Sequence, residues 1–235
     1  MKGLTAVILC GGKGGRLKPF TDSLPKPLVP LNGKPLLYHL MNYLHKVGIK
    51  KFVLCTGYKA SSIEKFIKNQ SESGWEVICV NSGDVSMTDR IIDAREHISD
   101  QAIICYGDTI ANVDISALKE FHEERKALAT LTTFTLQSPF GIVNSDASGK
   151  ISTFEEKPVL PYWINIGFML CERGIFELLP QGSTMVDLLT ELADAGKLFS
   201  YRHSGKHLTV NTEKERALAE NEIISFYTDV EGYIT

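Results

Sequence analysis

Residues 11–17, GGKGGRL, carry the strongest chemical signal in the sequence. Four glycines within five positions let backbone N–H groups approach phosphate oxygens closely, and Arg16 adds a planar cationic group. The spacing differs from the dinucleotide fingerprint, because Leu17 occupies the last glycine position, and from the ATPase loop, because no Gly-Lys-Ser/Thr follows. We therefore predict a phosphate-binding loop, with a plain flexible turn as the alternative.

Lys26 follows this loop and stands between Pro25 and Pro27. Proline restricts both itself and the residue before it, so the backbone around Lys26 is held in an extended form. A lysine fixed in this way is a suitable point charge for a phosphate. Without the preceding glycine loop, a surface turn would explain the motif equally well.

Two further segments combine charge with a position after an apolar run. Asp108 ends the segment Tyr106-Gly107-Asp108, where a carboxylate beside phosphate-binding groups suits Mg²⁺; the alternative is a turn or helix cap. Residues 154–158, FEEKP, again place a lysine before a proline, and a solvated charge cluster is the alternative there. The six histidines show no ligand spacing and receive no role.

The first half of the sequence alternates between strand and helix patterns that can position these residues. Short apolar runs at 6–10, 52–56, 77–80 and 102–106 predict buried strands, and residues 36–47, 63–67 and 91–98 predict helices between them. This alternation favours right-handed crossovers and a parallel sheet covered on both faces. Because ligands bind at the carboxyl ends of such strands, the polar segments after them should converge on one crevice.

The second half contains more strand. Residues 128–136, 141–145, 151–154 and 164–171 predict strands, and residues 116–126, 185–195 and 213–224 predict helices, while 225–235 show no clear period. No linker or internal repeat interrupts the chain. We therefore predict one α/β domain over residues 1–235, doubly wound and Rossmann-like, with a mostly parallel but mixed sheet.

Composition narrows the classes of function. The 235 residues are 43% hydrophobic and 23% charged, with a formal net charge of -3, which disfavours disorder and a nucleic-acid partner. No apolar run approaches the ~20 residues of a membrane helix, and the N-terminal apolar stretch fits a buried strand better than a signal peptide. The five cysteines lie in apolar runs without metal spacing. These features predict a cytoplasmic protein with reduced core cysteines and no membrane insertion.

The ordered motifs resemble those of the sugar-1-phosphate nucleotidyltransferases. Residues 11–17 followed by Pro25-Lys26-Pro27 are similar to that family's G-G-x-G-T-R-L…P-K-P signature. Residues 106–108, 154–158 and 164–167 are similar to its G-D, E-K-P and I-N-G-G segments, in the same order. The resemblance runs from residue 3 to about residue 224 and implies the GT-A-like fold of the family, with a nucleotide-binding half at about 1–115 and an acceptor-binding half at about 116–235.

Within the family, the branch that the sequence resembles most is the glucose-1-phosphate cytidylyltransferases. Residues 81–88, NSGDVSMT, are similar to the D-T-G-x-x-S-M-T of that branch, where the thymidylyl and guanylyl branches carry a G-T-A-like segment. The resemblance implies catalytic roles for Arg16 and Lys26. It also implies a nucleotide site made of Leu9, Gly11, Gly12, Gly14, Gly15, Arg16, Lys26, Ser82, Ser86, Met87, Thr88, Gly107 and Asp108.

The implied reaction is attack of a phosphomonoester oxygen on the α-phosphorus of a nucleoside triphosphate, CTP in the cytidylyl branch, with pyrophosphate leaving. The implied cofactor is Mg²⁺, held by Asp108 and Asn211, the latter where the family usually has Asp. The implied acceptor site consists of Gly141, Glu156, Lys157 and Asn165. The family context implies a role in capsule or lipopolysaccharide assembly, and a homo-oligomer is left open.

Four departures from the family pattern keep alternatives open. Gly15 replaces a threonine, and Asp89 replaces a glycine. Ile166 replaces the first glycine of I-N-G-G and is expected to fill acceptor space. Asn211 replaces the second metal-binding aspartate. One alternative is a thymidylyl-, uridylyl- or guanylyltransferase acting on a heptose, mannose or polyol phosphate. The other is a non-catalytic nucleotide-binding regulatory protein. For Asn211 itself, the alternative is a cap for the helix that begins near Glu213.

Overall fold

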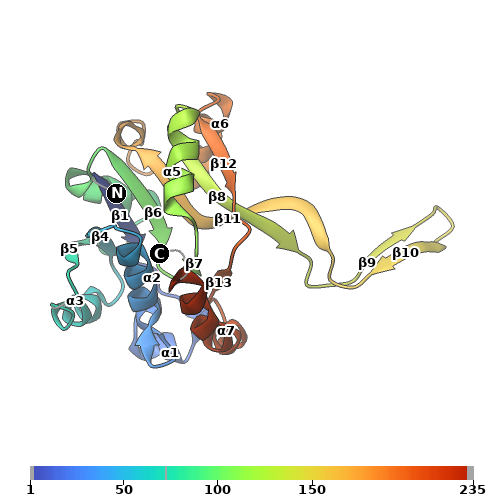
Figure 1. The fold of residues 1–235 in the computed structure, drawn as a ribbon, viewed down its shortest axis with the longest axis horizontal. Helices are drawn as coiled ribbons and strands as arrows, with labels where there is room; N and C mark the ends of the chain where they lie inside the picture. The colour runs from blue at the N-terminus through green and yellow to red at the C-terminus, as the bar shows by residue number, and fades with distance from the viewer. Residues whose placement is uncertain (1–2, 72, 232–235) are drawn as a thin grey trace.

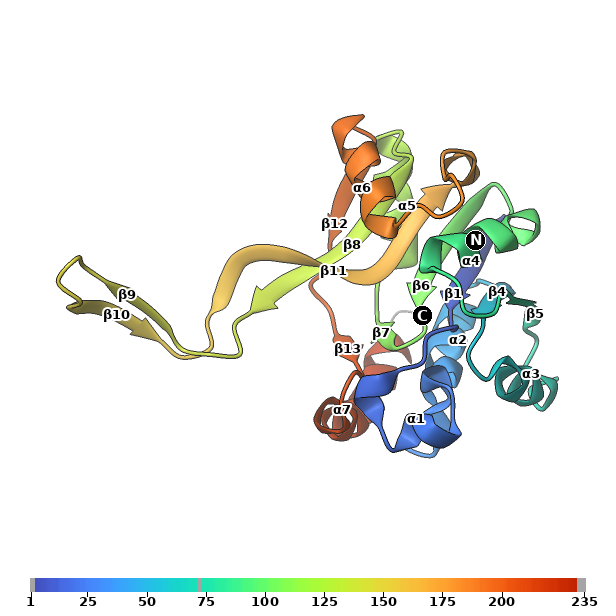
Figure 2. The same ribbon diagram turned by 180° about the vertical axis from the view of Figure 1, so that it is seen from behind.

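A seven-stranded mixed sheet forms the centre of the protein in a computed structural model that describes residues 3–71 and 73–231 (Figures 1 and 2). Its strand order is β12-β8-β11-β6-β1-β4-β5. β11 runs antiparallel to both neighbours, and the other neighbouring pairs are parallel, which confirms the predicted α/β class. The strands are β1 (Leu4–Leu9), β4 (Lys51–Thr56), β5 (Glu76–Asn81), β6 (Gln101–Tyr106), β8 (Ala129–Gln137), β11 (Val159–Glu172) and β12 (Leu198–Arg202).

Side chains on alternate positions of the central strands form two separate cores, one on each face of the sheet. In β1, Leu4, Ala6 and Ile8 belong to one core and Val7 to the other. This alternation follows from the two-residue period of a strand. Burial on both faces also explains why β1, β4 and β6 consist almost entirely of apolar residues.

Helices cover both faces, as the crossover pattern predicted (Figures 1 and 2). The first core receives side chains from α2 (Leu36–Lys46), α3 (Ala60–Lys68), α5 (Ile115–Glu124) and α7 (Glu213–Glu231). The second core receives them from α4 (Met87–Ala94) and α6 (Met185–Asp194). Short elements complete the fold: α1 (Phe20–Ser23), and the 3₁₀ helices η1 (Gly15–Leu17), η2 (Lys26–Leu28), η3 (Arg95–His97) and η4 (Arg173–Glu177).

Three small two-stranded sheets lie outside the central sheet. They pair β2 (Pro30–Leu31) with β3 (Lys34–Pro35), β7 (Thr109–Ala111) with β13 (His207–Thr209), and β9 (Ile142–Ser145) with β10 (Ile151–Glu155). The β9–β10 hairpin stands away from the body at the end of an extension of β8 and β11 (Figures 1 and 2). Among the residues that the structure describes, no helix combines the length and apolar character needed to cross a membrane.

Most predicted elements match observed ones, although several bounds differ and the short elements α1, β2, β3 and β7 and the 3₁₀ helices were not predicted. α7 continues to Glu231, although residues 225–231 show no clear period, while residues 232–235 lie outside the described chain. β12 was not predicted, because it is a short edge strand, paired with β8, whose side chains are only partly buried. All five cysteines are free, and four are buried. The division into a nucleotide half and an acceptor half of a single domain stays a prediction.

Candidate active site

A cleft of about 490 Å³ opens where β1 and β6 end. Its position matches the expectation that the polar segments after the parallel strands converge. Most of the predicted nucleotide-site residues line it, together with both predicted metal ligands. The full lining is Leu9, Cys10, Gly11, Gly12, Lys13, Gly14, Gly15, Arg16, Lys26, Pro27, Asp84, Val85, Met87, Arg90, Tyr106, Gly107, Asp108 and Asn211.

Contacts in its second half hold the glycine-rich loop in place. Leu17 is fully buried, and the Thr21 Oγ1 hydroxyl donates to the Gly14 carbonyl at 3.1 Å. Gly14 has φ of 61°, and a Cβ on it would lie 2.9 Å from the Cβ of Lys26. Glycine is therefore required at this position both for the left-handed backbone and for the approach of Lys26.

Lys26 is the centre of a polar network at the floor of the cleft. Its Nζ donates to Asp108 Oδ2 at 2.5 Å and to Asn211 Oδ1 at 2.8 Å. Arg16 Nη2 also donates to Asn211 Oδ1, at 3.0 Å. The Lys26 side chain is only 12% exposed, so its ammonium acts with little screening by water. The cationic groups of Lys26 and Arg16 and the side-chain oxygens of Asp108 and Asn211 therefore meet at one place in the cleft.

The ladder between β7 and β13 brings Asp108 and Asn211 together from 103 positions apart in the sequence. Thr109 pairs with Thr209, so the residues next to this pair emerge at the same place. The Val210 N–H donates to the Asp108 carbonyl at 3.1 Å. Gly107 N–H donates to the Leu9 carbonyl at 3.1 Å, and a Cβ on Gly107 would lie 2.8 Å from that oxygen, so a side chain there would push β1 and β6 apart.

The capping alternative for Asn211 is wrong, because Thr212 performs that role. Thr212 Oγ1 accepts from the Glu215 N–H at 3.2 Å, and the Glu215 carboxylate accepts from the N–H groups of Thr212 and Asn211. This reciprocal arrangement is a capping box at the start of α7. The side-chain oxygen of Asn211 is therefore directed to the two cations of the cleft.

The nucleotide-site residues predicted in the segment 81–88 divide into two groups. Met87 lines the cleft, whereas Ser82, Ser86 and Thr88 are outside its lining. Ser86 caps α4 by accepting from the Asp89 N–H at 3.0 Å. Ser82 and Thr88 have buried hydroxyl oxygens without a hydrogen-bond partner in the described residues.

Arg90 is a cleft residue that the sequence reasoning missed. It is 5% exposed, and its Nη1 donates to the carbonyls of Thr56 at 3.1 Å and Gly83 at 2.9 Å. A buried guanidinium that lines a cleft can hydrogen-bond a base or a phosphate. The sequence did contain a sign that Arg90 points inward: it lies four residues before the buried Ala94, and residues four apart share one face of a helix.

Lys13 and Asp84 connect the glycine loop to the segment before α4. Lys13 Nζ lies 2.7 Å from Asp84 Oδ2, and this hydrogen bond lowers the pKa of Asp84 and raises that of Lys13. Because both side chains are well exposed, the pair contributes little to stability. Burial, followed by the nearby Asp108 charge, raises the pKa of Tyr106, so this phenol stays neutral beside the cleft.

The predicted acceptor residues are not gathered in one place. Asn165 lies at a small second cavity beside the cleft, where its Oδ1 accepts from the Gly167 N–H at 2.9 Å. Gly141, Glu156 and Lys157 lie on the projecting segment between β8 and β11. The second cavity is lined by Ile104, Tyr106, Leu131, Asn165, Gly167, Met169, Met185 and Leu189.

The expectation that Ile166 fills acceptor space is wrong. Ile166 is 3% exposed and packs in the hydrophobic core rather than in the lining of the second cavity. Asn165 and Gly167, on either side of it, do line that cavity. Alternation of side chains along β11 explains the difference, since neighbouring residues point to opposite faces.

Comparison with known proteins assigns the family. The sequence profile described as "Nucleotidyl transferase" matches residues 5–204. The chain belongs to this nucleotidyltransferase family. It is 32% identical to a "Glucose-1-phosphate cytidylyltransferase" of Salmonella typhi, over 92% of this chain and 95% of that protein. It is also 32% identical to a "D-glycero-alpha-D-manno-heptose 1-phosphate guanylyltransferase" of Campylobacter jejuni, over 74% of this chain and 78% of that protein.

Solved structures support the fold of this nucleotidyltransferase. HddC from Yersinia pseudotuberculosis superposes with a TM-score of 0.74 at 23% identity, covering 93% of this chain and 98% of HddC. Relatives in the family transfer cytidylyl, uridylyl and guanylyl groups. Family membership therefore gives the reaction class, a nucleoside triphosphate and a sugar phosphate as substrates, and general use of a divalent metal ion.

Proposed function

We propose that this chain joins CTP to a sugar 1-phosphate or a similar small phosphomonoester, giving a CDP-linked product and pyrophosphate. The observation that carries the proposal is the convergence of the glycine loop, Arg16, Lys26, Asp108 and Asn211 on one cleft. Backbone N–H groups and two cations suit a triphosphate. Oxygen donors beside them suit a metal ion bound to the same phosphates.

In the proposed reaction, an oxygen of the acceptor phosphate attacks the α-phosphorus while the bond from that phosphorus to the pyrophosphate oxygen breaks. The acceptor oxygen is already ionised near neutral pH, so no side chain needs to remove a proton. The protein must therefore align the two phosphates and neutralise the charge that develops. Lys26 and Arg16 are the cations placed to do so, and Asn211 holds both of them in position.

Asp108 and Asn211 fit Mg²⁺ as its protein ligands. Each offers a side-chain oxygen, the kind of ligand that Mg²⁺ prefers. The two oxygens lie close together, because both accept a hydrogen bond from Lys26 Nζ. Magnesium usually takes one or two carboxylates and completes its shell with water and phosphate oxygens. When bound, Mg²⁺ would neutralise charge on the triphosphate, and Asp108 would supply the one carboxylate.

The choice of cytosine is supported by the cytidylyl relative and by Arg90. In the described residues both hydrogen bonds from Arg90 to protein carbonyls leave from Nη1. The guanidinium has further N–H groups, and cytosine offers two adjacent acceptors, N3 and O2. Uracil and thymine carry a donor at N3, so a donor placed there would select against them.

Pyrophosphate release with CTP, UTP, dTTP and GTP, each with a panel of phosphorylated acceptors, tests the proposal. We expect CTP to exceed the other triphosphates in kcat/KM by about 10²-fold or more, the size typical of a site that hydrogen-bonds its substrate. Equal use of CTP and dTTP would overturn the choice of base and leave the reaction class intact. Nucleotide binding without pyrophosphate release from any pair would instead support the non-catalytic alternative.

A further inference from the structure

A surface pocket of about 460 Å³ lies beside α2 and α3 and shares no residue with the cleft. Both helices pack on the same face of the sheet (Figure 1). The pocket is called the amide pocket below. It is lined by Tyr38 and Asn42 of α2 and, from the segment between α3 and β5, by Asn69, Gln70, Ser71, Ser73 and Trp75. Its volume is in the range of small-molecule sites, roughly 300–1,000 Å³.

The pattern of α2 places two side chains at this pocket. Tyr38 and Asn42 are four residues apart, so they share one face of the helix. Both are partly exposed, whereas Leu37, Met41 and Leu44 are fully buried in the core. The packed face of α2 therefore fixes the helix, and the neighbouring face presents a phenol and an amide.

Backbone hydrogen bonds hold the two ends of the segment that follows α3. The Gln70 N–H donates to the Ile67 carbonyl at 2.9 Å, which continues the last turn of α3. The Trp75 N–H donates to Ser73 Oγ at 3.2 Å. Gly74 between them has φ of 74°, a left-handed backbone that favours glycine. These contacts place Gln70 and Trp75 at the pocket in defined positions.

Tyr38 and Trp75 form an aromatic wall that is anchored to the core. Their ring centroids lie 5.7 Å apart, and the Trp75 ring is also 6.2 Å from the ring of Phe52, which is fully buried in β4. Distances in this range are typical of favourable aromatic pairs. Because the wall is built before any ligand arrives, binding would cost little ordering entropy there.

The polar side chains of the pocket are not used by the fold. Among the described residues, the side-chain amides of Asn42, Asn69 and Gln70 and the hydroxyl of Tyr38 make no hydrogen bond to another residue. Each amide offers two N–H donors and an oxygen acceptor, and a phenol can both donate and accept. Three amides and a phenol thus face one pocket with donors and acceptors available.

The lining also carries no charge. Among the described residues it contains no lysine, arginine, aspartate or glutamate. Lys34 lies beside the pocket, with its Nζ over the Tyr38 ring at 4.9 Å from the centroid. A phosphate or a metal ion would need charged or anionic partners in the lining, so these ligands do not fit. A neutral ligand with many hydroxyl groups does fit.

We propose that the amide pocket binds a neutral saccharide. Neighbouring hydroxyls of a pyranose ring each donate and accept, which matches the paired donors and acceptors of an amide. The C–H face of the ring is apolar and suits the wall of Tyr38 and Trp75. The segment that lines the pocket leads into the start of β5, whereas the cleft lies where β1 and β6 end. The saccharide would therefore bind separately from the triphosphate, and the proposal uses no residue of the cleft.

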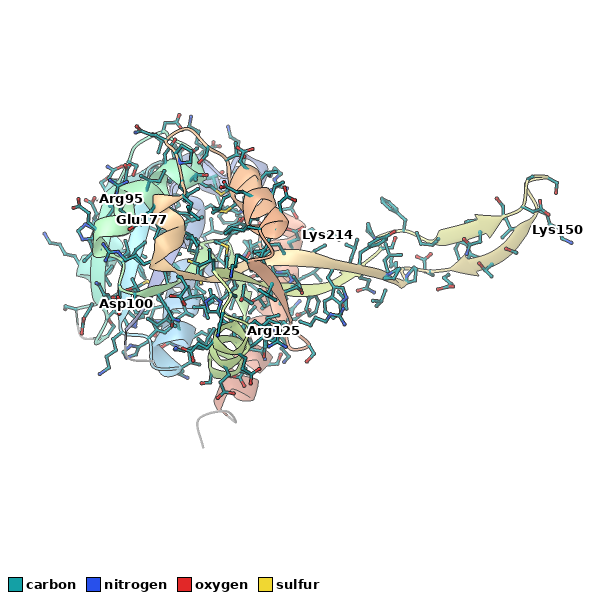
Figure 3. All side chains as sticks on the ribbon, turned by 90° about the horizontal axis from the view of Figure 1, so that it is seen from above. Arg95, Asp100, Arg125, Lys150, Glu177 and Lys214 are labelled. Carbon is teal, nitrogen blue, oxygen red and sulfur yellow. The ribbon has the colours of Figure 1, made fainter. Side chains whose placement is uncertain are left out.

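Tryptophan fluorescence can report on this pocket. The chain has two tryptophans, Trp75 and Trp163. Trp163 lies in β11, on the projecting segment whose tip, at Lys150, is far from the labelled residues of the body (Figure 3). In the full chain with Trp163→Phe, the signal comes from Trp75 alone. The probes are D-glucose, D-mannose, D-galactose and maltose, with sulfate as a charged probe.

At least one of the four sugars is expected to give a saturable change, with a dissociation constant on the order of 1 mM, whereas sulfate should give none. Asn42→Ala combined with Gln70→Ala should weaken binding at least about 10-fold, because two hydrogen-bonding side chains are lost. Asn221→Ala, at an exposed position on α7, is the matched control and should leave the affinity unchanged.

Three results would overturn the proposal. The first is the absence of a saturable change with all four sugars. The second is an unchanged affinity in the Asn42→Ala, Gln70→Ala protein. The third is loss of sugar binding in Lys26→Ala, which alters the cleft and leaves the amide pocket intact, because the sugar would then occupy the cleft. The measurement involves no turnover, so a failure of the proposed function would leave its outcome unaffected.

Discussion

The cleft and the arm, which is the projecting segment of residues 138–164, differ in what holds the predicted site residues. In the cleft, Lys26 is largely buried and bonded to two partners, so the chain itself fixes its position. On the arm, Lys157 is mostly exposed and its near neighbour is the equally exposed Glu156. The difference teaches that the body of the fold fixes the side chains of the cleft, while the position of Lys157 is left to a projecting, solvent-exposed segment. Substitutions in the two regions should therefore change different kinetic constants.

The largest effect is expected from Asp108→Asn, which removes the one carboxylate proposed as a metal ligand. The initial rate of pyrophosphate release should fall by about 10³-fold or more, because a metal ion contributes several kcal/mol of charge stabilisation. The matched control is Asp114→Asn, since Asp114 caps α5 and asparagine caps a helix equally well. An Asp108→Asn protein with unaltered rate and Mg²⁺ dependence would contradict the metal site.

Lys26→Ala should lower kcat by roughly 10²–10³-fold, the size typical of losing one preorganised electrostatic group. The KM for the triphosphate should change much less, because the glycine loop and Arg16 remain. Steady-state kinetics at saturating Mg²⁺ measures both constants. Lys18→Ala, which removes a lysine from an exposed ion pair with Asp22, is the control. Near wild-type turnover of Lys26→Ala would remove Lys26 from the mechanism.

Arg90→Lys should reduce discrimination between CTP and UTP by roughly 10- to 100-fold, because lysine keeps the charge and loses the planar set of donors. The measurement is the ratio of kcat/KM for the two triphosphates. Arg95→Lys, at an exposed position just after α4, should leave that ratio unchanged. Loss of activity toward both triphosphates in equal proportion would show that Arg90 supports the cleft without reading the base.

Lys157→Ala should raise the KM for the acceptor about 10-fold, a size consistent with losing one charge-assisted hydrogen bond, and leave the KM for CTP unchanged. This split is the sharpest test of the difference between the two regions. Lys150→Ala, at the tip of the same arm, is the control. An equal rise in both KM values would indicate that the arm supports the whole fold.

The smallest effect is expected from Asn211→Asp. The substitution adds charge with little change in shape, so kcat should change by less than about 3-fold, and the Mg²⁺ concentration for half-maximal rate should fall. Initial rates against Mg²⁺ concentration measure this. The added charge would also strengthen the contacts that Lys26 and Arg16 make at this position. An unchanged Mg²⁺ dependence would mean that Asn211 only positions those two cations.

The sequence alone determined the features that depend on local pattern. Buried parallel strands contain runs of apolar residues, helices show their period, and glycine-rich segments mark the strand ends, so the α/β class and the residues 11–17 loop were predictable. The cap of α5 by Asp114 is a local feature of the same kind, since it involves only the next three residues. Lys26 was found because of the two flanking prolines, but the extended backbone expected around it is wrong: Pro25 is extended, and Lys26 begins the 3₁₀ helix η2.

Tertiary structure decided the features that depend on distant partners. Asp108 meets Asn211 through the β7–β13 ladder, and Arg90 enters the cleft because α4 packs under the glycine loop. Thr212, rather than Asn211, caps α7, because Lys26 and Arg16 engage the asparagine oxygen from elsewhere in the chain. The position of the arm also depends on tertiary structure. Alternating patterns predicted its strands, but strand pattern does not encode whether a hairpin packs on its own sheet or projects from it.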